Sequence, residues 1–186
     1  GLIAGRLEEI DKRLAAIDQV LGKDFPEYAA ASPPEPITLT DVQALLREDE
    51  ALMVMFDTGA WRSAAEEAFI WVVTRDGARW VRSGLGRAAL AEHVAALRCG
   101  LDQFAWDKDG GSACAKLLPG EAPGALLPFD PQRAHALYRA LFGQVEDLIA
   151  DRHLLLVPSG ALTTLPFHVL VTDTPPAAIP ADPSAY

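Results

Sequence analysis

The chain has 186 residues, half of them hydrophobic, and a net charge of −10. Its mean hydropathy is +0.12 and its pI about 4.8. This composition predicts one domain with a real core, with room for a small appendage, and excludes a wholly disordered chain. The acidic balance argues against a large nucleic-acid surface, which needs clustered Lys and Arg. No apolar run is long enough for a membrane helix, and no signal peptide is visible.

The two cysteines, Cys99 and Cys114, do not make a disulfide framework. They also lack the spacing of a Cys/His metal site, so we expect no metal and no cofactor. This usage favours a reducing compartment and predicts a cytoplasmic protein.

Residues 2–22 predict an amphipathic helix within an N-terminal segment, 1–24. Glu8–Lys12 and Glu9–Arg13 are favourable pairs on its outer face. The narrow stripe suits a coiled-coil seam or docking on a neighbour. Packing on its own domain and the end of a helical repeat array are both open alternatives. The apolar residues step by 4, 3, 4, 3 and 4: Ile3, Leu7, Ile10, Leu14, Ile17 and Leu21.

Residues 25–37 are rich in proline and predict a linker before the main domain, 38–172. A short helix should begin at Thr40, with Gln43 completing a capping box. The run 51–56 then predicts a buried strand. The sequence lacks an initiating Met, so we expect a piece of a longer protein.

The next segment predicts a β-hairpin with Asp76-Gly77 between strands 69–75 and 78–83. Trp71 and Trp80 should share one sheet face, as core aromatics or, alternatively, as a ligand platform.

Two helices are expected after the hairpin, over 86–101 and 131–149. Asp130 is a natural N-cap and Pro131 a favourable first residue for the second. The stretch between them, 102–129, predicts a mobile surface insertion. The proline-rich end, 173–186, predicts an exposed loop or tail.

The most informative stretch is 153–170, HLLLVPSGALTTLPFHVL. Its apolar run and following turn predict a strand buried on both faces, as in a helix-covered parallel sheet. Sites in such sheets form beyond the carboxyl ends of strands. Ser159 stands there, but V-P-S-G-A is not the G-x-S-x-G of a hydrolase elbow. His168 is more typical of a core histidine than of a catalytic base.

Other nucleophile and metal candidates are weaker. Cys99 and Cys114 have no local base that would activate a thiolate. His93 and His135 lie on predicted helices without a second histidine at the spacing that metal binding needs.

The pattern L-L-L-V-P-S-G-A-L-T-T-L-P-F-H-V-L resembles the signature of CHAT domains, caspase-like domains found with tetratricopeptide repeats in bacterial proteins. Upstream stretches that resemble the same family are PPEPITLTDVQALLREDEALMVMF, FIWVVTRDG, WVRSGLG, LAEHVAALRCGLD and PFDPQRAHALYRALFGQVEDLI. The resemblance runs from about residue 28 onward and implies an α/β class with a partial caspase-like fold.

The resemblance implies the N-terminal half of the domain, because the family's His-Gly and Cys motifs are missing here. The parent would be a cysteine endopeptidase with its Cys–His dyad outside this chain. Ser159, Thr163 and Thr164 would border the substrate groove. The implied partners are the rest of the domain, upstream helical repeats and a protein or peptide substrate. The alternatives are a non-catalytic interaction scaffold and a serine hydrolase using Ser159 and His168.

Overall fold

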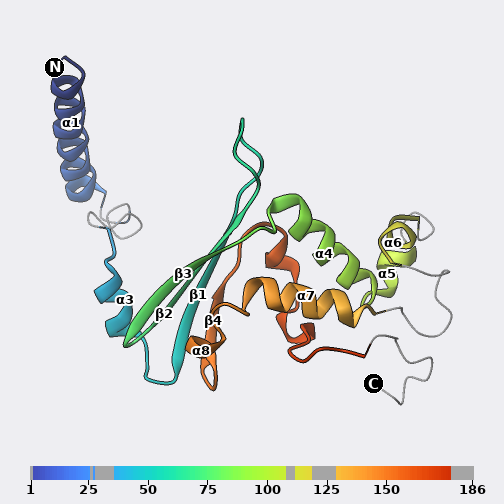
Figure 1. Cartoon of the computed structure of the whole chain (residues 1–186). Coiled ribbons are helices and arrows are strands. Elements are labelled where there is room, and N and C mark those ends of the chain that lie inside the picture. Colours follow the sequence, from blue (N-terminus) through green and yellow to red (C-terminus); the bar gives the residue numbers. More distant parts are fainter. Residues whose placement is uncertain (1, 26, 28–35, 108–111, 119–128, 177–186) are drawn as a thin grey trace. The chain divides into compact units, whose positions relative to one another are not determined.

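The computed structural model describes residues 2–25, 27, 36–107, 112–118 and 129–176. The chain divides into two units, Gly1–Val42 and Gln43–Tyr186 (Figure 1). The first unit holds the predicted amphipathic helix, α1, over Leu2–Asp24. Lys12 pairs with Glu8 at 2.8 Å on its outer face, whereas no ion pair joins Glu9 and Arg13 in this described helix. The predicted linker lies mostly outside the described residues.

Helix α3, Leu39–Leu45, begins near the predicted residue but uses a different cap. The backbone nitrogen of Thr38 donates to Asp41 Oδ2 at 2.9 Å, and the Asp41 nitrogen donates to Thr38 Oγ1 at 3.2 Å. The predicted pairing of Thr40 with Gln43 is therefore wrong. The reciprocal bonds of a capping box form two residues earlier, with an acidic residue in the last position.

The second unit is built on a four-stranded mixed sheet with the order β3-β2-β1-β4, which confirms the α/β class. The strands are β1 Glu50–Asp57, β2 Ala68–Thr74, β3 Gly77–Ser83 and β4 His153–Val157. β1 pairs with β2 antiparallel and with β4 parallel. The hairpin of β2 and β3 is confirmed, but its two linking residues are Arg75 and Asp76, since Gly77 already pairs with Thr74.

One face of the sheet carries the core. Helices α4, Arg87–Cys99, and α7, Pro131–Leu141, lie on this side (Figure 1). A turn of 3-10 helix, η2, Gly160–Thr164, packs with them through the buried Leu162. The strand residues that face this core are fully buried: Ala51, Met53, Met55, Ala68, Ile70 and Val72.

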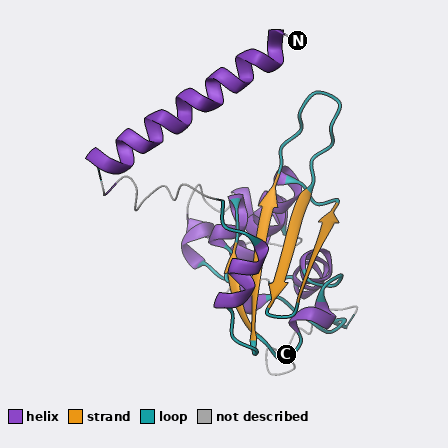
Figure 2. Ribbon diagram, turned by 90° about the vertical axis from the view of Figure 1, so that its left-hand side faces the viewer, coloured by secondary structure: helices purple, strands orange, loops and turns teal. Residues whose placement is uncertain are grey.

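The other face of the sheet is apolar and exposed. Val157, Val54, Trp71 and Trp80 stand side by side across all four strands in the pairing register. Trp71 is 39% exposed and Trp80 is 57% exposed, so the predicted shared face is confirmed but the predicted core location is wrong. In Figure 2 the strands stand in front of α4 and α7. Phe56 and Leu155 are also exposed on this face.

Two further expectations on the helices need correction. The predicted helix over 131–149 is broken into α7 and a short α8, Glu146–Ile149. Phe142 caps α7, and the Val145 nitrogen donates to the Phe142 carbonyl at 2.8 Å, so the chain leaves the helix at Gly143. The beginning is as predicted, because the Asp130 side chain accepts from the Arg133 nitrogen at 2.9 Å and Pro131 follows.

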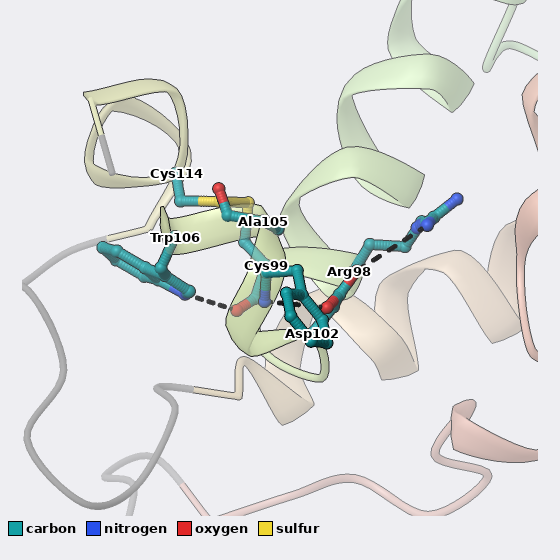
Figure 3. Close-up of a disulfide and its surroundings, with 7 residues drawn as sticks. Arg98, Cys99, Asp102, Ala105, Trp106 and Cys114 are labelled. Carbon is teal, nitrogen blue, oxygen red and sulfur yellow. Dashed lines mark hydrogen bonds and ion pairs between the residues drawn. A yellow bond between two sulfur atoms is a disulfide. The ribbon is translucent and has the colours of Figure 1, made fainter. Parts of the chain in front are cut away.

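The predicted surface insertion contains two short helices, α5, Gln103–Asp107, and α6, Ser112–Leu117. They surround a disulfide between Cys99 and Cys114 (Figure 3). Trp106 is buried there and its Nε1 donates to the Cys99 carbonyl at 2.6 Å. The expectation of a mobile surface insertion does not fit residues 103–107 and 112–118, because the covalent link gives these two helices a small core of their own. Residues 108–111 and 119–128 of the predicted insertion lie outside the described residues.

Residues 173–176 are irregular, and the remainder of the predicted tail lies outside the described residues. Among the helices of the described part, none is long and apolar enough to cross a membrane.

Candidate functional site

The carboxyl ends of the parallel strands β1 and β4 meet at one edge of the sheet, where the sequence predicts a site. Asp57 is the last residue of β1, and Ser159 follows β4 after Pro158. Although 102 residues apart in sequence, these two side chains are in direct contact. Parallel pairing brings them together because Val157, the last residue of β4, pairs with Val54, so the turn that follows β4 runs beside the end of β1.

Asp57 is the centre of this group. Ser159 Oγ donates to Asp57 Oδ1 at 2.5 Å and accepts from the Asp57 nitrogen at 3.0 Å. Arg87, the first residue of α4, donates from Nε to Asp57 Oδ2 at 2.9 Å and from Nη2 to the Asp57 carbonyl at 3.2 Å. The Asp57 side chain is only 3% exposed, whereas Arg87 is 61% exposed. The three residues therefore tie β1, the β4 turn and α4 together.

Burial by itself would raise the pKa of Asp57. The hydrogen bond from Ser159, together with the hydrogen bond and positive charge of Arg87, outweighs it and lowers the pKa below the ordinary value. Asp57 is thus an ionised carboxylate at neutral pH and does not supply a proton. One of its oxygens is bonded to Ser159 and the other to Arg87. The arrangement fits a structural clamp, which we call the Asp57 clamp.

Gly160 completes the Asp57 clamp. Its φ is +52°, and a β-carbon built on it would collide with Asp57 Oδ1. Only glycine tolerates both the left-handed backbone and this close approach. The Ser-Gly pair after β4 is therefore explained by the turn that delivers Ser159 to Asp57.

Sequence reasoning missed Asp57 and Arg87. A polar residue ending an otherwise apolar strand was the available signal for Asp57, since the carboxyl end of a buried strand is where such residues act. Arg87 gave no signal, because only the fold brings the first turn of α4 beside β1.

Thr163 and Thr164 lie next to each other on η2, and both are exposed. Their hydroxyls donate to the carbonyls of Gly160 and Ala161, at 2.8 and 2.9 Å. Both line a shallow hollow of about 440 Å³ whose charged residues are Arg98 and Asp102. Ser159 does not line this hollow. The structure therefore brings together two of the three predicted groove residues and assigns Ser159 to the Asp57 clamp.

His168 belongs to a different hollow. It follows Phe167 in a second 3-10 turn, η3, Phe167–Val169, and lines an apolar hollow of about 580 Å³ beside β4. Both His168 and Ser159 are among the described residues, and no hydrogen bond connects them. The serine-hydrolase alternative lacks the nucleophile–base contact that it requires.

The cysteines are also unavailable. Cys99 and Cys114 form a disulfide with each other, so neither is a thiol nucleophile. The disulfide is more typical of an oxidising compartment than of the reducing one that the sequence predicted. Within the described ranges no group of three or more His, Cys, Asp or Glu side chains could hold a metal ion. His93 is half-buried on α4, and burial followed by the charge of Arg133 lowers its pKa.

No protein-family model, curated protein or solved structure matches the chain. The resemblance to CHAT domains therefore stays a prediction.

Proposed function

We propose that the chain forms the first half of a caspase-like domain of the CHAT type, whose remaining strands add beyond β4. In this proposal the complete domain is a cysteine endopeptidase of a bacterial repeat-containing protein. Its catalytic Cys and His come from the part that follows residue 186. The chain described here supplies the first strands of the sheet, one layer of helices and one wall of the substrate groove.

The observation that carries the proposal is the apolar face of the sheet. Three cross-strand rows run over this face, and the middle one joins Val157, Val54, Trp71 and Trp80. The members at the ends of the rows are exposed, among them Phe56 at 51% and Leu155 at 44%. Only the β1–β4 pair is parallel. Fully parallel sheets are covered on both faces, whereas antiparallel sheets commonly leave a polar face to solvent, and the residues exposed on this face are largely apolar. A large exposed apolar surface is typical of an interaction site, and in this proposal a second layer of the complete domain occupies it.

The β4 edge supports the same conclusion. Its sequence, HLLLV, is apolar from Leu154 onward, which predicts burial on both faces. That prediction is wrong for the described chain, because β4 is an edge strand whose residues are exposed or half-buried in alternation. Natural edges are usually protected by charges, prolines or a covering segment. An apolar strand at an edge fits a sheet that continues beyond it.

The hollow beside β4 is apolar as well. Leu154 and Leu156 point to it, and Phe142, Phe167 and Leu170 form its other sides. A further strand along β4 with its own apolar side chains would fill this space. In this proposal the sheet continues here with a further strand.

Thr163 and Thr164, with Arg98 and Asp102, are the groove wall in this proposal. Ser159 has a positioning role, since it orients the β4 turn through the Asp57 clamp. The substrate would be a polypeptide.

The competing function is a non-catalytic interaction scaffold. Two observations favour it: both thiols are in a disulfide, and the Ser159 hydroxyl is bonded to a carboxylate. The described chain thus presents no activated nucleophile.

The test begins with the parent polypeptide, whose sequence after Tyr186 should contain a His-Gly motif and then a Cys, each after a strand. The purified parent is incubated with a peptide library, and cleavage is detected by mass spectrometry. Cleavage that disappears in the Cys→Ala variant of the parent supports the endopeptidase. A parent that completes the sheet but lacks the two motifs is a scaffold. A parent that neither completes the sheet nor contains the two motifs overturns both functions.

The cytoplasmic location remains part of the proposal. The disulfide weighs against it, since structural disulfides persist mainly in oxidising compartments. Alkylation of free thiols in freshly lysed cells decides this point: modification of Cys99 and Cys114 indicates a reducing location, and protection indicates an oxidising one.

A further inference from the structure

Helix α1 carries an exposed apolar stripe along its 23 residues, from 47% exposed for Ile17 to 80% for Ile3. The helix is about 34 Å long, at 1.5 Å per residue. A narrow stripe with a repeat of seven is the pattern of a coiled-coil seam rather than of a helix lying on a broad core.

The seam has a regular chemistry. If Leu7 is placed at position a of the heptad, leucine occupies every a position of α1, and isoleucine occupies every d position before Asp24, the last residue of the helix. In parallel coiled coils, leucine at a with isoleucine at d shifts the preference from two helices to three or four. The a residues are Leu7, Leu14 and Leu21, and the d residues are Ile3, Ile10 and Ile17.

The charges that flank the seam are sorted by position. Arg6 and Arg13 occupy g positions, and Asp11 and Asp18 occupy e positions. Across the part of the chain that the structure describes, none of these four side chains forms an ion pair. They are exposed and available to a partner.

The placement of arginine at g positions and aspartate at e positions favours a second copy of the same helix as the partner, in parallel orientation. In a parallel coiled coil a g residue meets the e residue five positions later on the neighbouring helix. Arg6 would then meet Asp11 of the partner subunit, and Arg13 would meet Asp18 of the partner subunit. An antiparallel arrangement would bring arginines toward arginines and aspartates toward aspartates. The two charged g positions thus complement the two charged e positions of the same sequence.

We propose that α1 is a self-association helix, which joins three or four copies of this chain in a parallel coiled coil. The copies would carry their α/β units at the same end of the bundle. This proposal is independent of the half-domain and of peptidase activity.

The test uses the whole chain and measures its mass by sedimentation equilibrium over a range of concentrations. The expected mass is about 60 or 80 kDa, three or four times the chain mass of 19.9 kDa. Dilution should reduce it, since a helix of three heptads associates reversibly. A monomer or a dimer at every concentration overturns the proposal.

Two variants separate α1 from the other apolar surface of the chain. Leu14→Glu places a charge in the seam and should reduce the mass to that of the monomer. Gln19→Glu, on the outer face, is the matched control and should leave the mass unchanged. An oligomer that survives Leu14→Glu is held by another surface, and the proposal is then wrong.

The charge pattern is tested by reversal. Arg13→Glu should raise the dissociation constant about tenfold or more, because Glu then faces Asp18 of the partner subunit. The double variant R13E/D18R should restore association. Failure of the double variant to recover, with helicity preserved by circular dichroism, contradicts the g-to-e pairing.

Direction is tested by Leu21→Cys. The native cysteines are linked to each other, so the introduced thiol is the free one. In a parallel bundle the introduced thiols are neighbours and cross-link on mild oxidation. In an antiparallel bundle they are about 27 Å apart, the rise from residue 3 to residue 21, and do not cross-link. Absence of the cross-link in an oligomer that still forms contradicts the parallel arrangement.

Discussion

At the scale of single residues, Asp57 does the most to organise the sheet edge. It is buried, ionised and bonded by both Ser159 and Arg87. Replacing it with Asn keeps the volume but removes the charge that both partners recognise. We expect Asp57→Asn to lower the free energy of unfolding by about 1–2 kcal/mol. This is the contribution of a charge-assisted hydrogen bond, reduced because Arg87 is exposed to solvent.

Denaturant unfolding measures this change. Asp147→Asn is the control, because Asp147 pairs with Arg79 on the surface and its loss should change stability little. Equal effects for the two variants would contradict the structural role of the Asp57 clamp.

The effect of pH on the stability of Asp57→Asn follows from the direction in which folding shifts the pKa of Asp57. The pKa of Asp57 is lowered from its ordinary value of 3.8 in the folded protein. Its stabilisation is therefore complete above 3.8 and is lost as the pH falls through the lower folded value. The stability difference between wild type and Asp57→Asn should be constant near neutral pH and shrink below about pH 3.8. A difference that grows on acidification contradicts the lowered pKa.

Gly160 gives a second residue-scale prediction. Gly160→Ala adds a β-carbon at a left-handed position and against Asp57 Oδ1. The backbone alone should cost about 1–2 kcal/mol, and displacement of the carboxylate adds to it. Gly84→Ala, where a β-carbon meets no atom within 4 Å, should stay within about 0.5 kcal/mol of wild type. Thermal unfolding compares the two, and equal melting temperatures would contradict the close approach.

At the scale of elements, the disulfide controls a separable part of the second unit. It closes a loop of 15 residues and holds α5 and α6 against the end of α4. In the chain-entropy model, opening a loop of this size costs about 3 kcal/mol. Reduction should therefore lower the melting temperature and expose Trp106, whose fluorescence reports the change.

The double variant C99S/C114S is the control for that experiment, since its stability should not respond to reductant. If wild type also fails to respond, the disulfide does not stabilise this part of the protein.

The elements also show what sequence could and could not predict. α1, α4, the hairpin and β1 were predictable because their apolar periodicity is local and strong. The break at Gly143 was missed because the apolar helix periodicity continues through it. The cap at Thr38 was missed because Asp41 takes the place of the usual Glu or Gln of a capping box. The disulfide was missed because pairing of Cys99 with Cys114 depends on the turn after α4, and no pattern marks it.

For the site, the sequence predicted chemistry at the turn after β4, and this turn is where Ser159 contacts Asp57. The groove role of Ser159, Thr163 and Thr164 stays a prediction. It could not supply Asp57 or Arg87. Asp57 meets Ser159 across 102 residues of sequence, and Arg87 reaches Asp57 from the N-terminus of α4. Burial of β4 was predicted from its apolar composition. Composition shows that a strand is suited to a buried position, but whether its side chains are buried depends on which neighbouring elements are present.

At the scale of the whole molecule, the second unit, Gln43–Tyr186, is built on a sheet whose one face packs on helices and whose other face carries exposed apolar side chains. The apolar row through Val54, Trp71 and Trp80, together with the apolar β4 edge, is suited to a further strand and a second layer. The half-domain proposal rests on this feature.

Hydrogen–deuterium exchange of β4 tests that claim most directly, by comparing the 186-residue chain with the longer parent protein. The proposal predicts that those amides of His153–Val157 that point away from β1 exchange quickly in the short chain and become protected in the parent. The amides of β3, at the opposite edge, are the internal control and should not change as much. Equal exchange of β4 in the two proteins would show that nothing adds to this edge and would contradict the half-domain.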